Sequence, residues 1–219
     1  MDTQLTAIEV RVLGCLVEKE STTPDAYPLS LNAVTTACNQ KTSRDPVMAL
    51  DASTVQEALD ALVKRTFAAT RSSAGSRVVK YAHRLHDRLS PEFSFARDEL
   101  AVMCLLFLRG PQTRGELRTH SARLHAFQDT AEVGDVLSRL QEREDGPYVT
   151  QLPVSPGHKE ARFAHLVAGD VEYTPSEAPA APVSDEGARV AALEQEVRAL
   201  RDEVTSVSER LNAFMKQFD

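Results

Sequence analysis

The stretch that decides the fold runs from Ser53 to Tyr81 and reads STVQEALDALVKRTFAATRSSAGSRVVKY. Its first half predicts a helix over residues 53–65, because apolar residues recur there with helical spacing. Ser53 followed by Gln56 has the pattern of a capping box, so we expect this helix to be capped at Ser53. The expected buried face consists of Val55, Ala58, Leu59, Leu62 and Val63.

The second half of this stretch predicts a β-hairpin. Phe67 to Thr70 and Arg77 to Tyr81 read as two short strands, separated by a turn rich in serine and glycine. A helix followed by such a hairpin is typical of the winged helix-turn-helix, a module that most often binds DNA.

Two further helices are expected before this stretch. Thr6 and Glu9 form a capping box ahead of an apolar face, which predicts a helix that ends near residues 19–20. Ser30 is expected to cap a second helix that extends to about Asn39. Three helices and a hairpin complete one winged unit.

Residues 95–166 repeat this plan. The helix starts are marked by Glu99, by Thr113 with Glu116, and by Asp129 with Glu132. Four apolar positions of the third helix match at one constant offset: Val55 with Val133, Ala58 with Val136, Leu59 with Leu137, and Leu62 with Leu140. The second pair of strands is expected at Tyr148 to Leu152 and Ala161 to Leu166. The sequence therefore predicts a duplicated domain.

The end of the chain has a different character. Residues 171–187 are rich in proline and alanine and predict an extended linker, and residues 188–219 predict a coiled-coil helix. Its heptad seam consists of Val190, Leu193, Val197, Leu200, Val204, Val207, Leu211 and Phe214. We expect this helix to form a homodimer; the alternative is an amphipathic helix that folds back on the winged domains.

Composition limits the classes of function. The 219 residues are 42% hydrophobic, enough for real cores, and their apolar runs are too short to cross a membrane. Of the net charge of −7, residues 171–219 carry −5, with 5 basic and 10 acidic side chains, whereas residues 1–88 carry +1. This balance argues against strong nonspecific binding of nucleic acid. Three cysteines without a Cys-x-x-Cys pair predict a reducing, cytoplasmic location.

A basic surface is nevertheless expected around the first hairpin. The helix at residues 53–65 is a poor reader of bases, because Glu57 and Asp60 would repel phosphates, although Gln56 could contact adenine. The candidate nucleic-acid-binding residues are Lys41, Arg44, Gln56, Lys64, Arg65, Arg71, Arg77 and Lys80. The alternative is that the hairpin is simply an arginine-rich, solvated element.

Catalytic and metal sites are not expected. His83 and His86 could chelate a metal, but no third ligand lies at a recognisable spacing. Cys15 and Cys104 fall among apolar helix positions and read as core, and Cys38 reads as a buried helix residue despite nearby Lys41. No motif for a catalytic nucleophile or a phosphate-binding loop is present, so we expect no enzyme and no cofactor.

Many short segments resemble the YceH-like proteins, an uncharacterised bacterial family. They include Leu5-Thr6-Ala7-x-Glu9-x-Arg11-Val12-x-Gly14-Cys15-Leu16-x-Glu18-Lys19, Ala37-Cys38-Asn39-Gln40-Lys41-Thr42, Arg44-x-Pro46-Val47-Met48, Leu62-Val63-Lys64-Arg65, Leu108-Arg109-Gly110-x-Gln112-Thr113, and Arg143-Glu144-Asp145-Gly146-Pro147. The resemblance implies a tandem winged-helix fold and carries no established activity. In one departure, Ala96 stands where these proteins usually have a helix-capping serine.

The expected fold is therefore mainly α with small β wings, in the α+β class. Winged-helix domains are expected at residues 1–88 and 89–170, followed by the linker and the coiled coil. The expected function is binding of double-stranded DNA, with regulation of transcription as its context, mainly through phosphate contacts of the first wing. The alternative is a scaffold that docks an unknown protein partner.

Overall fold

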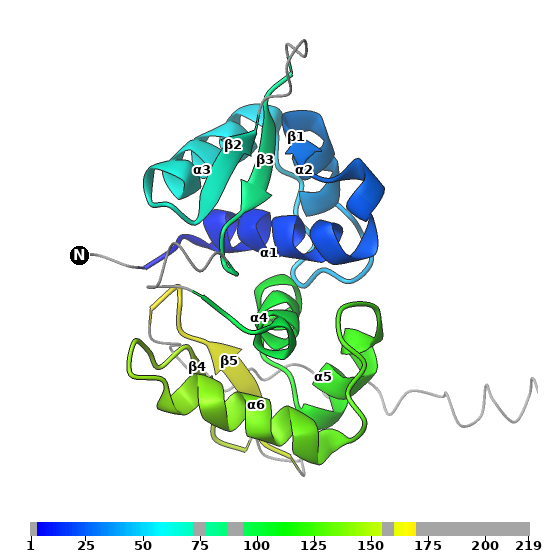
Figure 1. Cartoon of the computed structure of the whole chain (residues 1–219), viewed down its shortest axis with the longest axis vertical. Helices are drawn as coiled ribbons and strands as arrows, with labels where there is room; N and C mark the ends of the chain where they lie inside the picture. Colours follow the sequence, from blue (N-terminus) through cyan, green and yellow to red (C-terminus); the bar gives the residue numbers. More distant parts are fainter. Residues whose placement is uncertain (1–3, 72–77, 87–93, 155–159, 170–219) are drawn as a thin grey trace, which may run out of the picture. The chain divides into compact units, whose positions relative to one another are not determined.

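The computed structural model describes residues 4–71, 78–86, 94–154 and 160–169 (Figure 1). The chain divides into two compact units, Met1–Tyr173 and Thr174–Asp219, and every described residue belongs to the first. The expected linker and coiled-coil seam lie outside the described residues. The described part is an α+β structure of helices and small antiparallel sheets.

The first half of this unit contains three helices and a three-stranded sheet. Its elements are α1 (Ala7–Thr22), the 3₁₀ turn η1 (Pro24–Ala26), β1 (Leu29–Ser30), α2 (Leu31–Cys38), α3 (Ala52–Lys64), β2 (Ala68–Arg71) and β3 (Lys80–His83). The strands are antiparallel in the order β1-β3-β2, with Leu29 opposite Tyr81 and Arg71 opposite Lys80. Strand β3 begins at Lys80, and the expected strand residue Arg77 lies outside the described residues.

The second half repeats the order of helices and hairpin. Its elements are α4 (Arg97–Arg109), α5 (Arg114–His120), the 3₁₀ turn η3 (Ser121–Arg123), α6 (Thr130–Glu142), β4 (Val149–Gln151) and β5 (Phe163–His165). Strands β4 and β5 pair antiparallel, with Val149 opposite His165. The positions matched by sequence agree in burial, because Val55 and Val133, Leu59 and Leu137, and Leu62 and Leu140 are all fully buried.

Most of the predicted helix caps are confirmed. In α1, the Thr6 hydroxyl accepts from the Glu9 amide (3.2 Å) and the Glu9 carboxylate accepts from the Thr6 amide (2.7 Å). Thr113 and Glu116 form the same reciprocal pair at α5. At α4, Ala96 has no capping hydroxyl, and only Glu99 accepts, from the Ala96 amide (3.0 Å).

The predicted start of α3 was wrong. The helix begins at Ala52, and its cap is Asp51, whose carboxylate accepts from the Thr54 amide (2.7 Å) and the Ser53 hydroxyl (2.8 Å). Ser53 therefore lies inside the first turn. These hydrogen bonds to the charged carboxylate lower the pKa of Asp51. The offset that relates Val55 to Val133 also relates Asp51 to Asp129, the cap of α6.

The predicted end of α1, near residues 19–20, came too early in the sequence. This helix continues to Thr22, and two threonine hydroxyls donate back to carbonyls of its last turns. Thr22 donates to the Glu18 carbonyl (2.9 Å) and Thr23 to the Lys19 carbonyl (3.2 Å). Such local bonds satisfy carbonyl groups that a helix end leaves without partners.

Helices α1 and α4 pack against each other and join the two halves (Figure 1). Gly14 makes their close approach possible, because a Cβ atom there would lie 2.9 Å from Phe107 Cβ and from Leu108 Cδ2. The Cys104 thiol lies 3.5 Å from the Gly14 carbonyl oxygen. Residues on both sides of the expected boundary at residues 88–89 belong to one hydrophobic core.

Within the described ranges, none of the helices combines the length and apolar character that spanning a bilayer requires.

Candidate functional site

The predicted basic residues do not form one continuous group. Arg71 and Lys80 face each other across the β2–β3 pair, and neither forms an ion pair among the described residues. Directly opposed residues share one face of a sheet and alternate with their neighbours. Tyr81 points to α3, where its hydroxyl meets Gln56, so the Arg71–Lys80 pair lies on the opposite face of the hairpin. Arg77 lies outside the described residues.

Gln56 on α3 is occupied by neighbours of its own chain. Its amide nitrogen donates to Asp60 (2.7 Å) and to the Tyr81 hydroxyl (3.0 Å). Glu57 and Asp60 are exposed on this helix. The outward face of α3 therefore presents carboxylates and an amide that is already hydrogen-bonded.

Lys41 and Lys64 are exposed, whereas Arg65 takes part in packing. The Arg65 guanidinium lies 3.5 Å from the Glu9 carboxylate and donates to the Gln4 carbonyl (3.0 Å). It also lies over the Phe67 ring, 5.4 Å from its centroid. These contacts tie the end of α3 to the start of α1.

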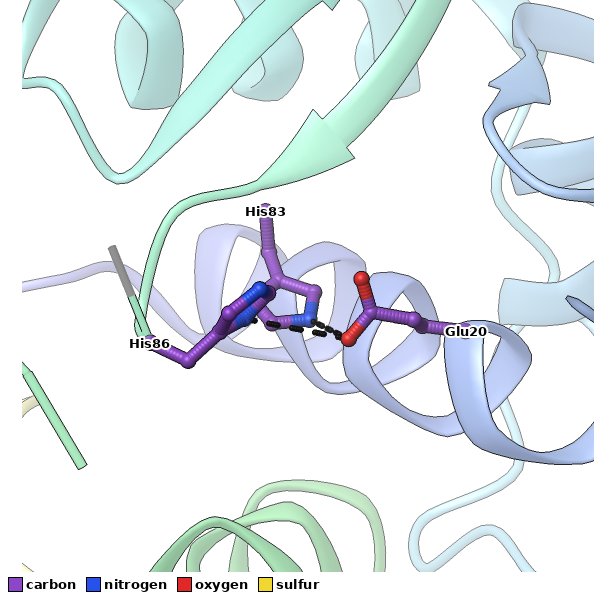
Figure 2. Close-up of side chains that lie close together, drawn as sticks. All are labelled: Glu20, His83 and His86. Carbon is purple, nitrogen blue, oxygen red and sulfur yellow. Dashed lines mark hydrogen bonds and ion pairs between the residues drawn. The ribbon is translucent and has the colours of Figure 1, made fainter. Parts of the chain in front are cut away.

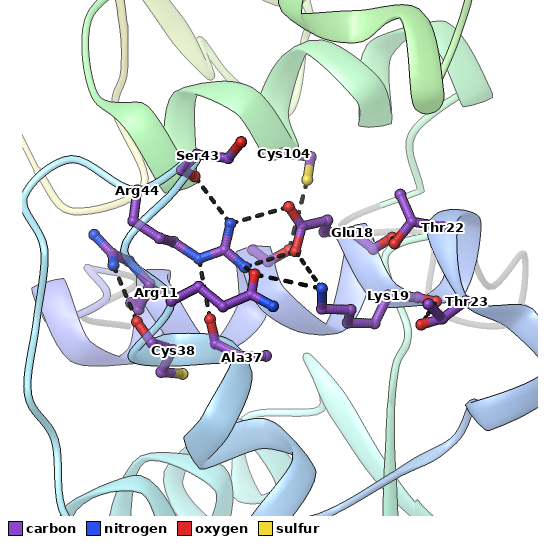
Figure 3. Close-up of polar contacts among 12 residues, drawn as sticks. Arg11, Glu18, Lys19, Thr22, Thr23, Ala37, Cys38, Ser43, Arg44 and Cys104 are labelled. Carbon is purple, nitrogen blue, oxygen red and sulfur yellow. Dashed lines mark hydrogen bonds and ion pairs between the residues drawn. The ribbon is translucent and has the colours of Figure 1, made fainter.

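Arg44 is buried, contrary to its predicted place on a phosphate-binding surface. Figure 3 shows its side chain reaching Glu18, which it contacts through both terminal nitrogens at 2.9 and 2.6 Å. Its remaining N–H groups donate to the carbonyls of Ala37 (3.1 Å) and Ser43 (2.9 Å) and to the Gln40 side-chain oxygen (2.9 Å). All five guanidinium donors are thus satisfied within the chain, which removes Arg44 from the solvent-facing set.

The ion pair with Arg44 also changes the pKa of Glu18. Burial raises the pKa of its carboxyl, but the hydrogen bonds and charge of Arg44, together with Lys19, outweigh burial and lower that pKa. Glu18 is therefore an ionised carboxylate with its charge already paired.

The segment from Asn39 to Pro46 connects helices rather than standing free. Asn39 makes two hydrogen bonds to the backbone of Leu50, at 2.7 and 2.8 Å. The Asp45 amide donates to the Leu108 carbonyl on α4 (2.8 Å). Arg11, which is almost fully buried, donates to the Pro46 carbonyl (2.6 Å). The segment therefore holds α1, α2 and α4 together.

The three cysteines are free and buried, as predicted. Complete burial raises the pKa of the Cys104 thiol. The hydrogen bond with Cys15 and burial raise that of Cys38. Burial acts in the same direction on Cys15, but Cys38 and Arg44 outweigh it and lower the Cys15 pKa. All three lie inside the core, so no thiol faces solvent.

A third side chain joins the two histidines that the sequence singled out. Figure 2 shows Glu20 of α1 beside His83 and His86, with its carboxylate 2.9 Å from His83 Nε2 and 3.8 Å from His86 Nδ1. One possible ligand atom of each residue lies within 4.8 Å of the others. Glu20 is distant in sequence, so only the fold brings it to the histidines.

The hydrogen bonds of His83 argue against a metal at this cluster. The Leu85 amide donates to His83 Nδ1 (3.2 Å), so the ring proton lies on Nε2 and is donated to Glu20. A metal bound at Nε2 would require the proton on Nδ1, where it would meet the Leu85 N–H group. Burial raises the pKa of Glu20, but the hydrogen bond from His83 and the neighbouring positive charges outweigh burial, so the pKa of Glu20 is lowered. The cluster fits an imidazole–carboxylate hydrogen bond better than a metal centre.

Comparison with known proteins identifies the family. Residues 5–158 match the model of a family described as "Protein of unknown function, DUF480". The chain belongs to this family. A UPF0502 protein of Enterobacter sp. (strain 638) is 50% identical over 210 residues, which cover 94% of this chain and 97% of the relative. The UPF0502 protein YceH of Salmonella paratyphi B is 49% identical over 209 residues, covering 94% and 97%.

The resemblance to YceH-like proteins is therefore confirmed. A UPF0502 protein of Serratia proteamaculans is 48% identical over 210 residues, covering 96% of this chain and 98% of that relative. The names of these relatives and of the family state no activity. A function for this chain therefore has to be inferred from the positions and contacts of its side chains. Among the described residues, Lys41, Lys64 and Arg71 are exposed basic side chains, and Lys80, which lies opposite Arg71, is partly buried.

Proposed function

We propose that this protein is a tandem winged helix-turn-helix protein that binds duplex nucleic acid through phosphate contacts of the β2–β3 hairpin. The observation that carries this proposal is the opposed pair Arg71 and Lys80, which places two cations side by side without an ion-pair partner among the described residues. Lysine and arginine side chains of this kind supply the phosphate contacts that position a protein on a duplex. Regulation of transcription is the context we propose.

The order of elements supports the winged-helix assignment. Each half has three helices followed by an antiparallel pair of strands, and capping residues recur at matching positions. In a winged helix-turn-helix, the third helix and the hairpin form the nucleic-acid-binding side.

Phosphate contact is favoured over reading of bases. The exposed carboxylates of Glu57 and Asp60 would repel the duplex backbone if α3 entered the major groove. Gln56 would have to break hydrogen bonds to Tyr81 and Asp60 before it could contact adenine. We therefore propose Lys41, Lys64, Arg71, Arg77 and Lys80 as phosphate-binding candidates and leave out Arg44, Gln56 and Arg65.

The experiment is titration of a random duplex at several salt concentrations. Arg71→Ala combined with Lys80→Ala is expected to weaken binding near 50 mM salt. It should also make the negative slope of log K against log salt less steep, by about 2. The matched control is Arg118→Ala combined with Arg162→Ala, which removes the same charge from exposed positions of the second half. Absence of duplex binding by the unaltered protein, or an equal loss in the control, would contradict the proposal.

A second candidate function is docking of a partner protein. Val78 and Val79, which directly precede strand β3, are 54% and 47% exposed. Adjacent exposed apolar side chains can contribute to a protein–protein interaction site. If duplex binding is absent, a partner that protects Val78 and Val79 from hydrogen exchange would favour this second function.

A further inference from the structure

A small polar cavity lies where the two halves meet. Its volume is about 220 Å³, and its walls come from α1, the Asn39–Pro46 segment, α4, α5 and the turn η3. The lining residues that matter here are Lys19, Thr42, Ser43, Arg109, His120 and Arg123. We propose that this cavity binds the phosphate group of a small phosphorylated ligand.

The charge of the cavity favours an anion. Glu18 also lines it, but Arg44 pairs with both oxygens of that carboxylate from behind the wall. Lys19 lies 3.3 Å from the same carboxylate and donates to the Gln40 side-chain oxygen (3.4 Å). Because Arg44 already balances Glu18, the cations Lys19, Arg109 and Arg123 remain in excess.

Arg109 is held in place before any ligand arrives. One terminal nitrogen donates to the Ser43 hydroxyl (2.9 Å), and the other lies 3.3 Å from His120 Nε2. Ser43 has the left-handed backbone angle φ 59°, which is uncommon for serine. An arginine fixed by two neighbours loses little side-chain entropy when it binds an anion.

His120 has the tautomer that this arrangement needs. The Gln112 amide nitrogen donates to the Leu105 carbonyl (3.1 Å), so its oxygen accepts from His120 Nδ1 (2.7 Å). His120 Nε2 is then a lone-pair acceptor for Arg109. Burial and the neighbouring Arg109 charge lower the pKa of His120, which keeps the ring neutral in this role.

These donors match a phosphate monoester. The planar arginine fork binds two phosphate oxygens at once, lysine adds a third charge-assisted hydrogen bond, and the Thr42 hydroxyl can donate a further one. The cavity is smaller than the roughly 300 Å³ at which pockets for drug-sized ligands begin, so it suits a phosphate group rather than a whole cofactor.

A neighbouring cavity provides space for the rest of the ligand. It has a volume of about 560 Å³ and shares Arg123 and Leu124 with the phosphate cavity. Its wall combines the apolar side chains of Val17 and Leu100 with the polar side chains of Glu20, His86 and Arg97. This pair of cavities fits a ligand whose phosphate lies in the first cavity and whose organic group, in contact with both apolar and polar side chains, lies in the second.

The test uses phenyl phosphate as the probe and the full chain in isothermal titration calorimetry at constant ionic strength. We expect saturable binding, weakened roughly tenfold by Arg123→Gln and by Lys19→Gln, because each removes one charge-assisted hydrogen bond. Arg123 is exposed, so its substitution leaves the fold intact. The matched control Arg118→Gln, an exposed arginine on α5 outside the cavity, is expected to bind like the unaltered protein.

Two further experiments distinguish a small phosphorylated ligand from the phosphate backbone of nucleic acid as the ligand of this cavity. Random duplex is not expected to displace phenyl phosphate, and Arg123→Gln is expected to leave duplex binding unchanged. Failure of duplex binding thus leaves this inference standing. No saturable heat up to about 10 mM phenyl phosphate, an equal loss in Arg118→Gln, or displacement by duplex would overturn it.

Discussion

Whether an arginine side chain of this protein is buried or exposed depends on whether its N–H groups find acceptors within the chain. Arg44 and Arg71 look alike in the sequence, since both lie in polar stretches near turns. Arg44 donates all five N–H groups to α1, α2 and its own loop, whereas Arg71 is exposed on a hairpin. A buried guanidinium without partners would cost several kcal/mol, so its satisfied hydrogen bonds are what allow Arg44 to lie inside.

His165 on β5 is predicted to make stability depend on pH. Burial lowers its pKa to about 4, its Nδ1 atom has no hydrogen-bond partner among the described residues, and its ring packs edge-on to Phe107. The unfolded chain, with an ordinary pKa of 6.5, binds this proton more tightly. Stability from this group is therefore complete above pH 6.5 and is lost as pH falls towards 4.

Urea unfolding at pH 7 and near pH 4.5 measures this effect. His165→Phe is expected to lose less stability between the two pH values than the unaltered protein, by on the order of 2 kcal/mol. The control Leu140→Val, at a buried residue of the same half that does not titrate, is expected to keep the original pH dependence. Identical pH dependence in all three proteins would contradict the role of His165.

At the scale of elements, helix starts follow the best capping group rather than the first matching motif. Ser53 with Gln56 satisfied the pattern of a capping box, but Asp51 caps α3, because a carboxylate is a stronger acceptor for free amides than a hydroxyl. The internal repeat also points to Asp51 as the cap, because Asp51 and Asp129 are related by the same offset as the buried residues of the two helices.

Substitution of Gly14 tests the close packing of α1 on α4. Alanine normally stabilises a helix by up to about 1 kcal/mol over glycine, but here its Cβ would lie 2.9 Å from Phe107 Cβ. Gly14→Ala is therefore expected to destabilise the protein by about 1–3 kcal/mol in chemical denaturation. The control Gly115→Ala, where the nearest atom lies 3.9 Å away, is expected to be neutral or slightly stabilising. A stabilised Gly14→Ala variant would show that the helices are further apart.

For the whole molecule, the acidic C-terminal segment is predicted to set the oligomeric state. Residues 188–219 carry an unbroken heptad seam, which favours a two-stranded coiled coil. Deletion of residues 184–219 is expected to convert a dimer into a monomer in light scattering. Leu200→Glu, in the seam, is expected to act like the deletion, and Ser206→Glu, on the outer face of the heptad, is expected to leave the mass unchanged. An unchanged mass after deletion would contradict the predicted dimer.

The sequence alone determined the helices, most of their caps, both hairpins, the internal repeat and the family. These features follow from contacts between residues a few positions apart, which periodicity and capping patterns express directly. The tertiary structure alone decided that Arg44 pairs with Glu18, that Glu20 meets His83, and that Lys19 and Arg109 line one cavity. Each of these depends on how α1 packs against elements distant in sequence. A residue's type tells which hydrogen bonds it can make, but only packing decides whether a distant partner or solvent receives them.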